Sequence, residues 1–133
     1  PLPRHTSVHG IPVQELLSEA DITECVDRAK VGGGEIVKLM GTSAYYAPAS
    51  GSVQMAEAIV KDKKRILPCA AYCDDQYGID GFFVGVPCVL GSSGVEKVIE
   101  IKLDEGEKGL MDESISHVKD LVGTVQTMFP ELA

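Results

Sequence analysis

Residues 42–49 read TSAYYAPA and lead, through three small residues, into VQMAEAIVKDKKR at residues 53–65. Small side chains, two tyrosines and a proline therefore stand where one helical pattern gives way to another. We expect the second helix to run from about Tyr45 to Lys63, with Pro48 tolerated because first-turn amides have no intrahelical partner. Small residues at a helix start either leave room for a ligand near the backbone or pack at a crowded corner between helices. Spacing alone favours the corner without excluding the ligand.

The chain before this junction predicts an extended lead-in and then a helix. Residues 1–13 contain three prolines, and we expect them to be extended, as the end of a strand whose partners lie elsewhere. Residues 23–40 predict a helix from the three- and four-residue spacing of Val26, Ala29, Gly33, Ile36 and Met40. Gly32–Gly34 interrupts this pattern, and each glycine costs a helix about 1 kcal/mol relative to alanine. Such a run indicates a bend or close approach by another backbone, and we favour close packing.

The chain after the junction predicts three strands joined by short connections. Residues 66–73 and 82–90 are strand-like, and Pro87 implies an edge position or a bulge. A turn at residues 91–94 leads into a third strand, residues 95–103, whose proposed inner face is Val95, Lys97, Ile99, Ile101 and Leu103. Short connections indicate an antiparallel arrangement of the three strands.

A long helix at residues 105–129 completes the pattern. Asp104 and Glu107 have the spacing of a capping box at its start. Its apolar stripe consists of Met111, Ile115, Val118, Val122, Val125 and Phe129. The predicted fold class is therefore α+β, a twisted antiparallel sheet with long helices packed on it.

Composition excludes some classes of function. The 133 residues amount to one domain, and 44% of them are apolar, which indicates either a well-filled core or an interface. The net charge of −8 argues against nucleic-acid binding, which needs a basic surface. We interpret the basic run at residues 61–65 as a solvated helix end rather than a phosphate site. No apolar stretch approaches the ~20 residues that span a bilayer, so we expect no membrane partner.

The four cysteines, Cys25, Cys69, Cys73 and Cys88, do not form a disulfide or zinc pattern. Cys69 and Cys73 lie four residues apart in a predicted strand, which separates them by roughly 13 Å, whereas a disulfide needs α-carbons within about 7 Å. We expect reduced, buried thiols, as in cytoplasmic proteins.

Other apparent motifs have structural explanations. A dinucleotide-binding loop needs a strand before its glycines, and Gly32–Gly34 has none; residues 91–94 fit a hairpin turn better than a phosphate loop. His5 and His9 lie too far apart in an extended segment to share a metal, and His117 falls on the polar side of its helix. We therefore assign no catalytic residue and no metal ligand in this chain.

Nearly the whole chain resembles the NAD-dependent malate dehydrogenases of the lactate/malate dehydrogenase family, in the branch built like lactate dehydrogenase. Four stretches carry the resemblance: residues 42–65, Tyr77-Gly78, VGVPCVLG at residues 84–91 and GVE at residues 94–96. The resemblance implies the α+β fold of the family's C-terminal substrate domain. It also implies reversible hydride transfer between NAD and a 2-hydroxy or 2-keto dicarboxylic acid, with (S)-malate and oxaloacetate as the pair.

Two site residues follow from the resemblance by position. In the family the junction closes the substrate pocket beneath the nicotinamide ring. Ser43 would line the pocket near the variable end of the substrate, and Ala47 would lie beside the nicotinamide. The family's catalytic histidine and its aspartate, its two substrate arginines and its glycine-rich NAD loop match no position here. Residues 1–4 resemble the segment just after the catalytic His-Gly-Asp.

The resemblance therefore implies that residues 1–133 are a substrate domain truncated at its N-terminal side. The NAD-binding Rossmann domain is absent from the chain, and we expect the chain to be inactive alone. The first residue is Pro1 rather than Met, which predicts a processed or excised piece. The family assembles as homodimers or homotetramers, and the helix containing Gly32–Gly34 is a candidate contact. Two alternatives remain, a lactate dehydrogenase fragment and a non-catalytic interaction domain that kept the fold; the pattern at residues 44–48 looks more like the malate branch.

Overall fold

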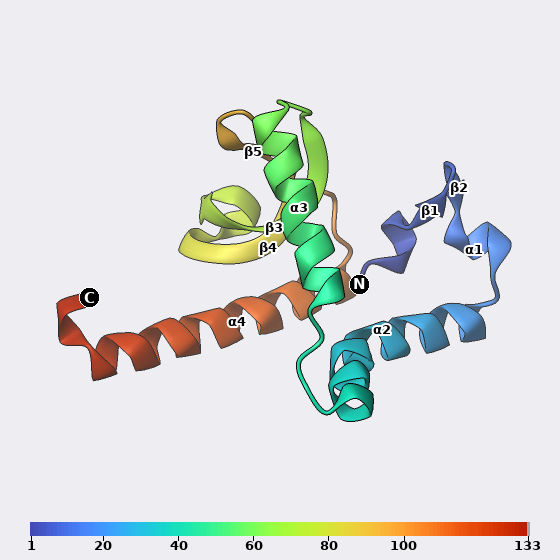
Figure 1. Ribbon diagram of the computed structural model, residues 1–133, viewed down its shortest axis with the longest axis horizontal. Helices are drawn as coiled ribbons and strands as arrows, with labels where there is room; N and C mark the ends of the chain where they lie inside the picture. The colour runs from blue at the N-terminus through green and yellow to red at the C-terminus, as the bar shows by residue number, and fades with distance from the viewer. Residues whose placement is uncertain (133) are drawn as a thin grey trace. The chain divides into compact units, whose positions relative to one another are not determined.

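The computed structural model describes residues 1–132, which belong to two compact units divided between Ser50 and Gly51 (Figure 1). The first unit contains one short hairpin and mainly helices. Its elements are η1 (Pro3–His5), β1 (Ser7–Val8), β2 (Ile11–Pro12), α1 (Val13–Leu16) and α2 (Glu19–Met40).

The lead-in is a small hairpin, so the expectation of strand partners elsewhere was wrong. β1 pairs with β2 in antiparallel fashion, with Val8 opposite Ile11. The two turn residues, His9 and Gly10, have φ of 51° and 87°. A two-residue turn with both φ values positive matches the right-handed twist of the strands, and this brings the partners together locally.

α2 begins at Glu19, four residues before the expected start. The Ser18 side chain accepts a hydrogen bond from the Asp21 amide at 3.2 Å and so caps the helix. The helix ends at Gly41, whose φ of 69° is the left-handed conformation of a glycine cap and whose amide donates to the Val37 carbonyl at 2.9 Å. Both ends of α2 are therefore set by side-chain or glycine caps.

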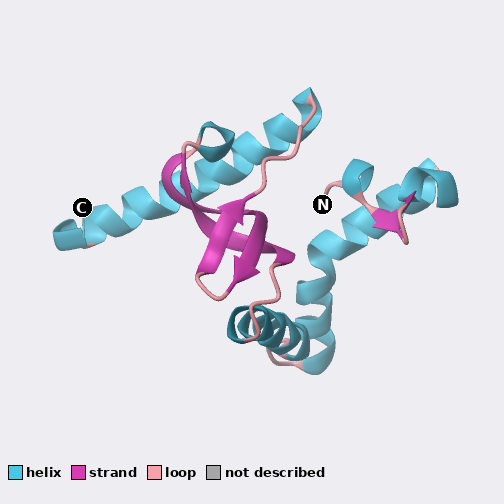
Figure 2. Ribbon diagram, turned by 90° about the horizontal axis from the view of Figure 1, so that it is seen from above, coloured by secondary structure: helices cyan, strands magenta, loops and turns pink. Residues whose placement is uncertain are grey.

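α2 passes through Gly32–Gly34 without interruption, and its axis changes direction along its length (Figure 1, Figure 2). A β-carbon placed on any of these three glycines would find no atom of the described chain within 4 Å. The favoured explanation, close packing against another backbone, is therefore wrong within the part of the chain that the structure describes.

The second unit contains an antiparallel sheet of order β3-β4-β5 with helices against it (Figure 2). Its strands are β3 (Arg65–Asp74), β4 (Asp80–Gly91) and β5 (Gly94–Val98). The other elements are η2 (Gln76–Gly78), α4 (Glu105–Met128) and η3 (Pro130–Leu132), and α3 (Tyr46–Val60) runs into the unit across the division at residue 50. The predicted α+β class is confirmed.

The core lies on one face of this sheet. Alternate residues of β3 and β4 are buried there together with Ala58 and Ile79: Cys69, Ala71, Cys73, Val84, Val86, Cys88 and Leu90. Met111 and Ile115 pack against this cluster from α4. The predicted stripe of α4 is only partly covered, since Val125 and Phe129 are exposed. Much of the apolar surplus in the composition therefore lies on the surface of the described chain rather than in its core.

The capping box at the start of α4 is confirmed. The Glu107 amide donates to the Asp104 side chain, and the Asp104 amide donates to the Glu107 side chain, both at 2.9 Å. α3 ends at Val60 rather than Lys63, because the Lys63 amide bonds back to the Ala58 carbonyl at 2.9 Å and closes the helix.

The third strand is shorter than expected, since β5 ends at Val98. Beyond it, the Tyr77 hydroxyl donates to the Ile99 carbonyl at 2.8 Å and accepts from the Ile101 amide at 2.9 Å. The Ile99 amide still bonds to β4, but the Ile99 carbonyl and the Ile101 amide are bonded by the Tyr77 side chain instead of by a neighbouring strand. The predicted inner face was also wrong, because Val98 packs against the core while Lys97 is exposed.

Pro87 lies in β4, the central strand, so of the two expected settings the edge position is excluded, whereas the β4–β5 pairing does contain a register irregularity, between Val89 and Leu90. The Pro87 carbonyl accepts a hydrogen bond from the Ile99 amide at 2.8 Å. The backbone edge of Pro87 that carries this carbonyl therefore faces the segment that follows β5. The N and C=O of a strand residue point to the same side, so the missing N–H also faces that segment. Pro87 is tolerated because the ladder with β5 ends at Cys88.

Candidate functional site

The candidate site is the junction between α2 and α3. Gly41 turns the chain out of α2, residues 42–45 form a short loop, and α3 begins at Tyr46. Ser43 lies in the loop and Ala47 in the first turn of α3. The Ala49 amide donates to the Tyr45 carbonyl at 2.9 Å, so the helix is established at its first possible hydrogen bond.

The side chains of this junction are mostly on the surface. Ser43 and Ala47 are exposed, and Ala44 is half-buried. Tyr45 and Tyr46 lie with ring centroids 4.7 Å apart and are 53% and 75% exposed. These side chains are therefore not crowded by other residues of the described chain.

The junction can contact a ligand and shape its pocket, but it has little capacity for acid–base chemistry. Residues 41–50 contain no histidine and no charged side chain. The Ser43 hydroxyl can donate or accept a hydrogen bond, and the methyl group of Ala47 leaves room for a flat ring. These residues fit the rim of a ligand site, and a proton acceptor for catalysis has to come from outside this stretch.

The three histidines belong to other elements of the fold than the junction. His5 ends η1, His9 occupies the β1–β2 turn, and His117 is on the exposed side of α4 as the sequence predicts. In residues 1–132, no three His, Cys, Asp or Glu side chains are grouped as a metal ion would require.

A hollow of about 440 Å³ in the second unit was missed by sequence reasoning. It is lined by Tyr77, Ile101, Lys102, Leu103, Lys108, Met111 and Asp112. The Lys108 ammonium lies 2.8 Å from Glu105, a hydrogen bond that raises the pKa of the lysine. Its cation is thus already paired, and the hollow shares no residue with the junction.

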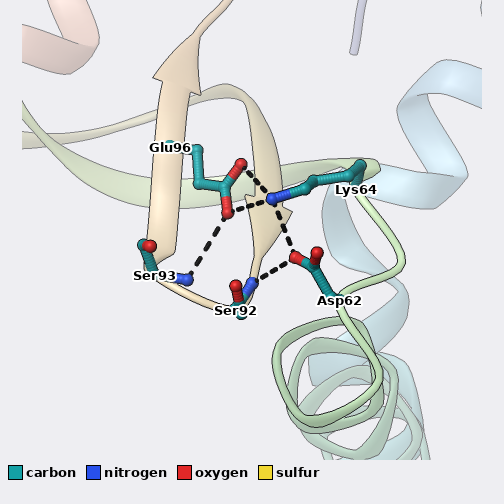
Figure 3. A network of polar contacts seen from close by, with 5 residues as sticks. All are labelled: Asp62, Lys64, Ser92, Ser93 and Glu96. Carbon is teal, nitrogen blue, oxygen red and sulfur yellow. Dashed lines mark hydrogen bonds and ion pairs between the residues drawn. The ribbon is translucent and has the colours of Figure 1, made fainter.

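The basic run after α3 is neutralised by carboxylates rather than presented to a phosphate. Lys64 Nζ lies 2.5 and 2.7 Å from the two Glu96 carboxylate oxygens and 2.8 Å from Asp62 (Figure 3). The Asp62 carboxylate also accepts the Ser92 amide at 2.7 Å, and Glu96 accepts the Ser93 amide at 3.4 Å. Hydrogen bonds to Asp62 and Glu96 raise the pKa of Lys64, and those from Lys64 and Ser92 lower the pKa of Asp62.

The Glu57 carboxylate forms ion pairs with the other three basic residues of this run. Glu57 lies 2.8 Å from both Lys61 and Lys63 and 3.6 Å from Arg65. The hydrogen bonds from Lys61 and Lys63 lower the pKa of Glu57 to about 2. The three cations are therefore paired with a carboxylate within the chain.

The thiols match the prediction with one exception. All four cysteines are free, but Cys25 is exposed on α2 rather than buried. Burial raises the pKa of Cys69, Cys73 and Cys88, which favours the thiol over the reactive thiolate. None of the helices formed by residues 1–132 combines the length and apolar character needed to cross a bilayer.

Comparison with known sequences identifies close relatives. The family model for the lactate/malate dehydrogenase α/β C-terminal domain matches residues 1–128. Malate dehydrogenase from Salinibacter ruber is 55% identical over 131 residues, which are 98% of this chain and 42% of the relative. The Rhodopirellula baltica enzyme is 54% identical over 132 residues, again 98% of this chain and 42% of the relative. The chain thus spans about 42% of the length of the curated relatives that it matches.

Solved structures agree with this result. The malate dehydrogenase of Salinibacter ruber matches all of this chain and 44% of its own, with a TM-score of 0.95 and 54% identity. A lactate dehydrogenase from Eimeria maxima, solved with NADH and oxamate, matches 96% of this chain and 42% of its own, with a TM-score of 0.92 and 38% identity. The order of helices and strands, the sequence and the family model agree, and the chain belongs to the lactate/malate dehydrogenase family, to its C-terminal domain.

Proposed function

We propose that this chain is the substrate domain of an NAD-dependent malate dehydrogenase, which interconverts (S)-malate and oxaloacetate. The observation that carries the proposal is the 55% identity to a malate dehydrogenase across 98% of the chain. The lactate dehydrogenase alternative has less support. The matched lactate dehydrogenases of Eimeria maxima and Cryptosporidium parvum are each 38% identical to this chain, against 55% for the malate dehydrogenase of Salinibacter ruber.

The junction supplies the chain's share of the site in this proposal. Ser43 lines the substrate pocket, where its exposed hydroxyl offers a hydrogen bond to the variable end of a dicarboxylic acid. By its position in the family pattern Ala47 lies beside the nicotinamide, and its methyl group in the first turn of α3 leaves room for the ring. When bound, NAD supplies the hydride acceptor, while these two residues orient substrate and ring.

The remaining groups belong to the part of the family polypeptide that precedes this region. The proton acceptor, the arginines that hold the carboxylates and the Rossmann domain are all placed there in our proposal. Residues 41–50 contain no histidine or charged side chain, which supports this division of roles. The 133-residue chain is therefore inactive alone, and the parent enzyme is a cytoplasmic homodimer or homotetramer.

The test joins this chain to the upstream region of the Salinibacter ruber malate dehydrogenase, in place of the matched region of that enzyme. The joined protein should oxidise (S)-malate with NAD, and the 133-residue chain should give no rate above background at the same molar concentration. Lactate oxidation as fast as malate oxidation, despite the upstream arginines of a malate enzyme in the joined protein, would favour the lactate alternative. A folded joined protein that binds NAD but oxidises neither acid would favour the non-catalytic interaction domain.

A further inference from the structure

One face of the sheet has no cover in the second unit. The core occupies the face that carries Cys69 and Val86, and the opposite face of β3 and β4 is exposed. We define this β3–β4 outer face by six exposed residues that alternate with the buried ones: Ile66, Pro68, Ala70, Tyr72, Phe83 and Gly85.

The outer face is apolar across both strands. Ile66, Tyr72 and Phe83 are 64%, 54% and 63% exposed. Tyr72 is the register partner of Phe83, and their rings meet edge to face with centroids 5.4 Å apart. No charged residue occurs in residues 66–73 or 82–90. An exposed patch of this kind marks a surface that another chain segment covers.

The strand pattern also indicates a permanent cover. Strands with one wet face alternate between apolar and polar residues, whereas strands covered on both faces are apolar throughout. β5 carries charged residues that face water, Glu96 and Lys97. β3 and β4 have the second pattern, although only one of their faces is buried here.

The shape of the outer face suits close packing. Ala70 is the register partner of Gly85, and this small pair lies between the aromatic pair and the pair of Pro68 and Pro87. A β-carbon at Gly85 would meet nothing within 4 Å. The small pair leaves the backbone open between larger side chains, so an apolar side chain of a covering segment can approach it closely.

We infer that the β3–β4 outer face is the seat of an apolar surface of the polypeptide that precedes this region in the parent dehydrogenase. More than half of each matched relative lies outside the aligned region, and that region is the family's C-terminal domain. A cover in the same polypeptide has a high effective concentration and needs no second molecule. This inference rests on the proposed origin of the chain in a longer malate dehydrogenase.

The experiment compares Phe83→Lys in two proteins, the 133-residue chain and the protein joined to the Salinibacter ruber upstream region. In the joined protein a lysine at this position has to enter a covered apolar contact, so Tm should fall by about 5 °C or more. In the 133-residue chain the position is open to water, and the shift should stay below about 2 °C. Val60→Lys is the matched control, because Val60 is 83% exposed on α3 and outside the face, and it should change both proteins little.

A second measurement needs no substitution. Hydroxyl-radical labelling of Tyr72 and Phe83 should be at least about 5-fold slower in the joined protein than in the 133-residue chain. Equal labelling in the two proteins, or equal small shifts in Tm, would overturn the inference. So would a dimer of the 133-residue chain that protects Tyr72 and that Phe83→Lys dissociates, because a second copy would then be the cover. Malate oxidation is measured separately, so loss of the proposed activity and loss of the cover are distinct results.

Discussion

The ammonium group of Lys64 binds both carboxylate oxygens of Glu96, 32 residues away, at 2.5 and 2.7 Å. The pair joins the segment after α3 to the β4–β5 hairpin. Asp62, in the same segment, also binds the Lys64 ammonium group (Figure 3). Gly91 makes room for the contact, since a β-carbon there would lie 2.7 Å from side-chain carbons of Lys64 and Glu96. This network anchors the helix whose first turn carries Ala47.

Lys64→Met should lower Tm by a few degrees at most, because the pair is partly exposed and water screens it. The difference between the variant and the parent chain should shrink in 1 M NaCl, where the Debye length is about 3 Å. Thermal unfolding followed by circular dichroism at low and high salt gives the measurement. Lys97→Met is the matched control on β5 and should leave Tm unchanged; an equal effect of the two substitutions would rule out a specific role for the network.

Glu57 should contribute to acid sensitivity. Its pKa is lowered from 4.5 to about 2 by Lys61 and Lys63, so the folded state favours the carboxylate. The stabilisation is fully present above about pH 4.5 and is lost as the pH falls toward 2. Urea midpoints measured from pH 6 to pH 2 should show Glu57→Gln less stable than the parent chain at pH 6 and equal to it near pH 2.

The matched control for the acid titration is Glu113→Gln, at an exposed position on α4. It should leave the pH dependence of the midpoint as it is in the parent chain. A Glu57→Gln difference that stayed constant over the whole range would show that the carboxylate acts through packing rather than through its charge.

Tyr77→Phe should destabilise the chain by about 1–2 kcal/mol, because the Ile99 carbonyl and the Ile101 amide both lose their partner. Urea unfolding gives the free energy, and hydrogen exchange should show faster exchange at the Ile101 amide. Tyr72→Phe removes a hydroxyl from an exposed side chain and is the control. Unchanged exchange at Ile101 in the Tyr77 variant would contradict the assigned role.

The thiols should react in two classes with an aromatic disulfide reagent at pH 8. Cys25 is exposed and should react first, while the three buried thiols, whose pKa values are raised, should react only as the chain unfolds. Cys25→Ser should remove the fast phase and leave the slow one. Three fast thiols in that variant would show that the sheet core is open in solution.

Substitutions at the two junction residues should change different Michaelis constants of the joined protein. Ala47→Phe fills the proposed nicotinamide contact and should raise KM for NAD at least about 10-fold, whereas Ser43→Val should raise KM for malate with little change for NAD. Ala56→Phe, at an exposed position on the same helix, is the control and should alter neither value. A rise in both KM values for either substitution would place these residues outside the assigned contacts.

The helices and strands were predictable where short-range chemistry decides them. The apolar runs that became β3 and β4, the capping box of Asp104 and Glu107, and the Ser92-Ser93 hairpin turn all follow from residues a few positions apart. The candidate site could be proposed from the resemblance at residues 42–49, and the structure shows only that Ser43 and Ala47 are exposed. Their contacts with substrate and NAD remain predictions.

By itself, the sequence determined the α+β class, the antiparallel order of the strands and the absence of a disulfide, because periodicity, caps and cysteine spacing act locally along the chain. The tertiary structure decided where β5 ends, which residue of β5 meets the core and where the basic run finds its carboxylates. Those outcomes depend on bonds such as Tyr77 to Ile101 and Lys64 to Glu96, which join residues 24 and 32 positions apart. No local pattern specifies such partners, because their proximity exists only once the sheet has formed.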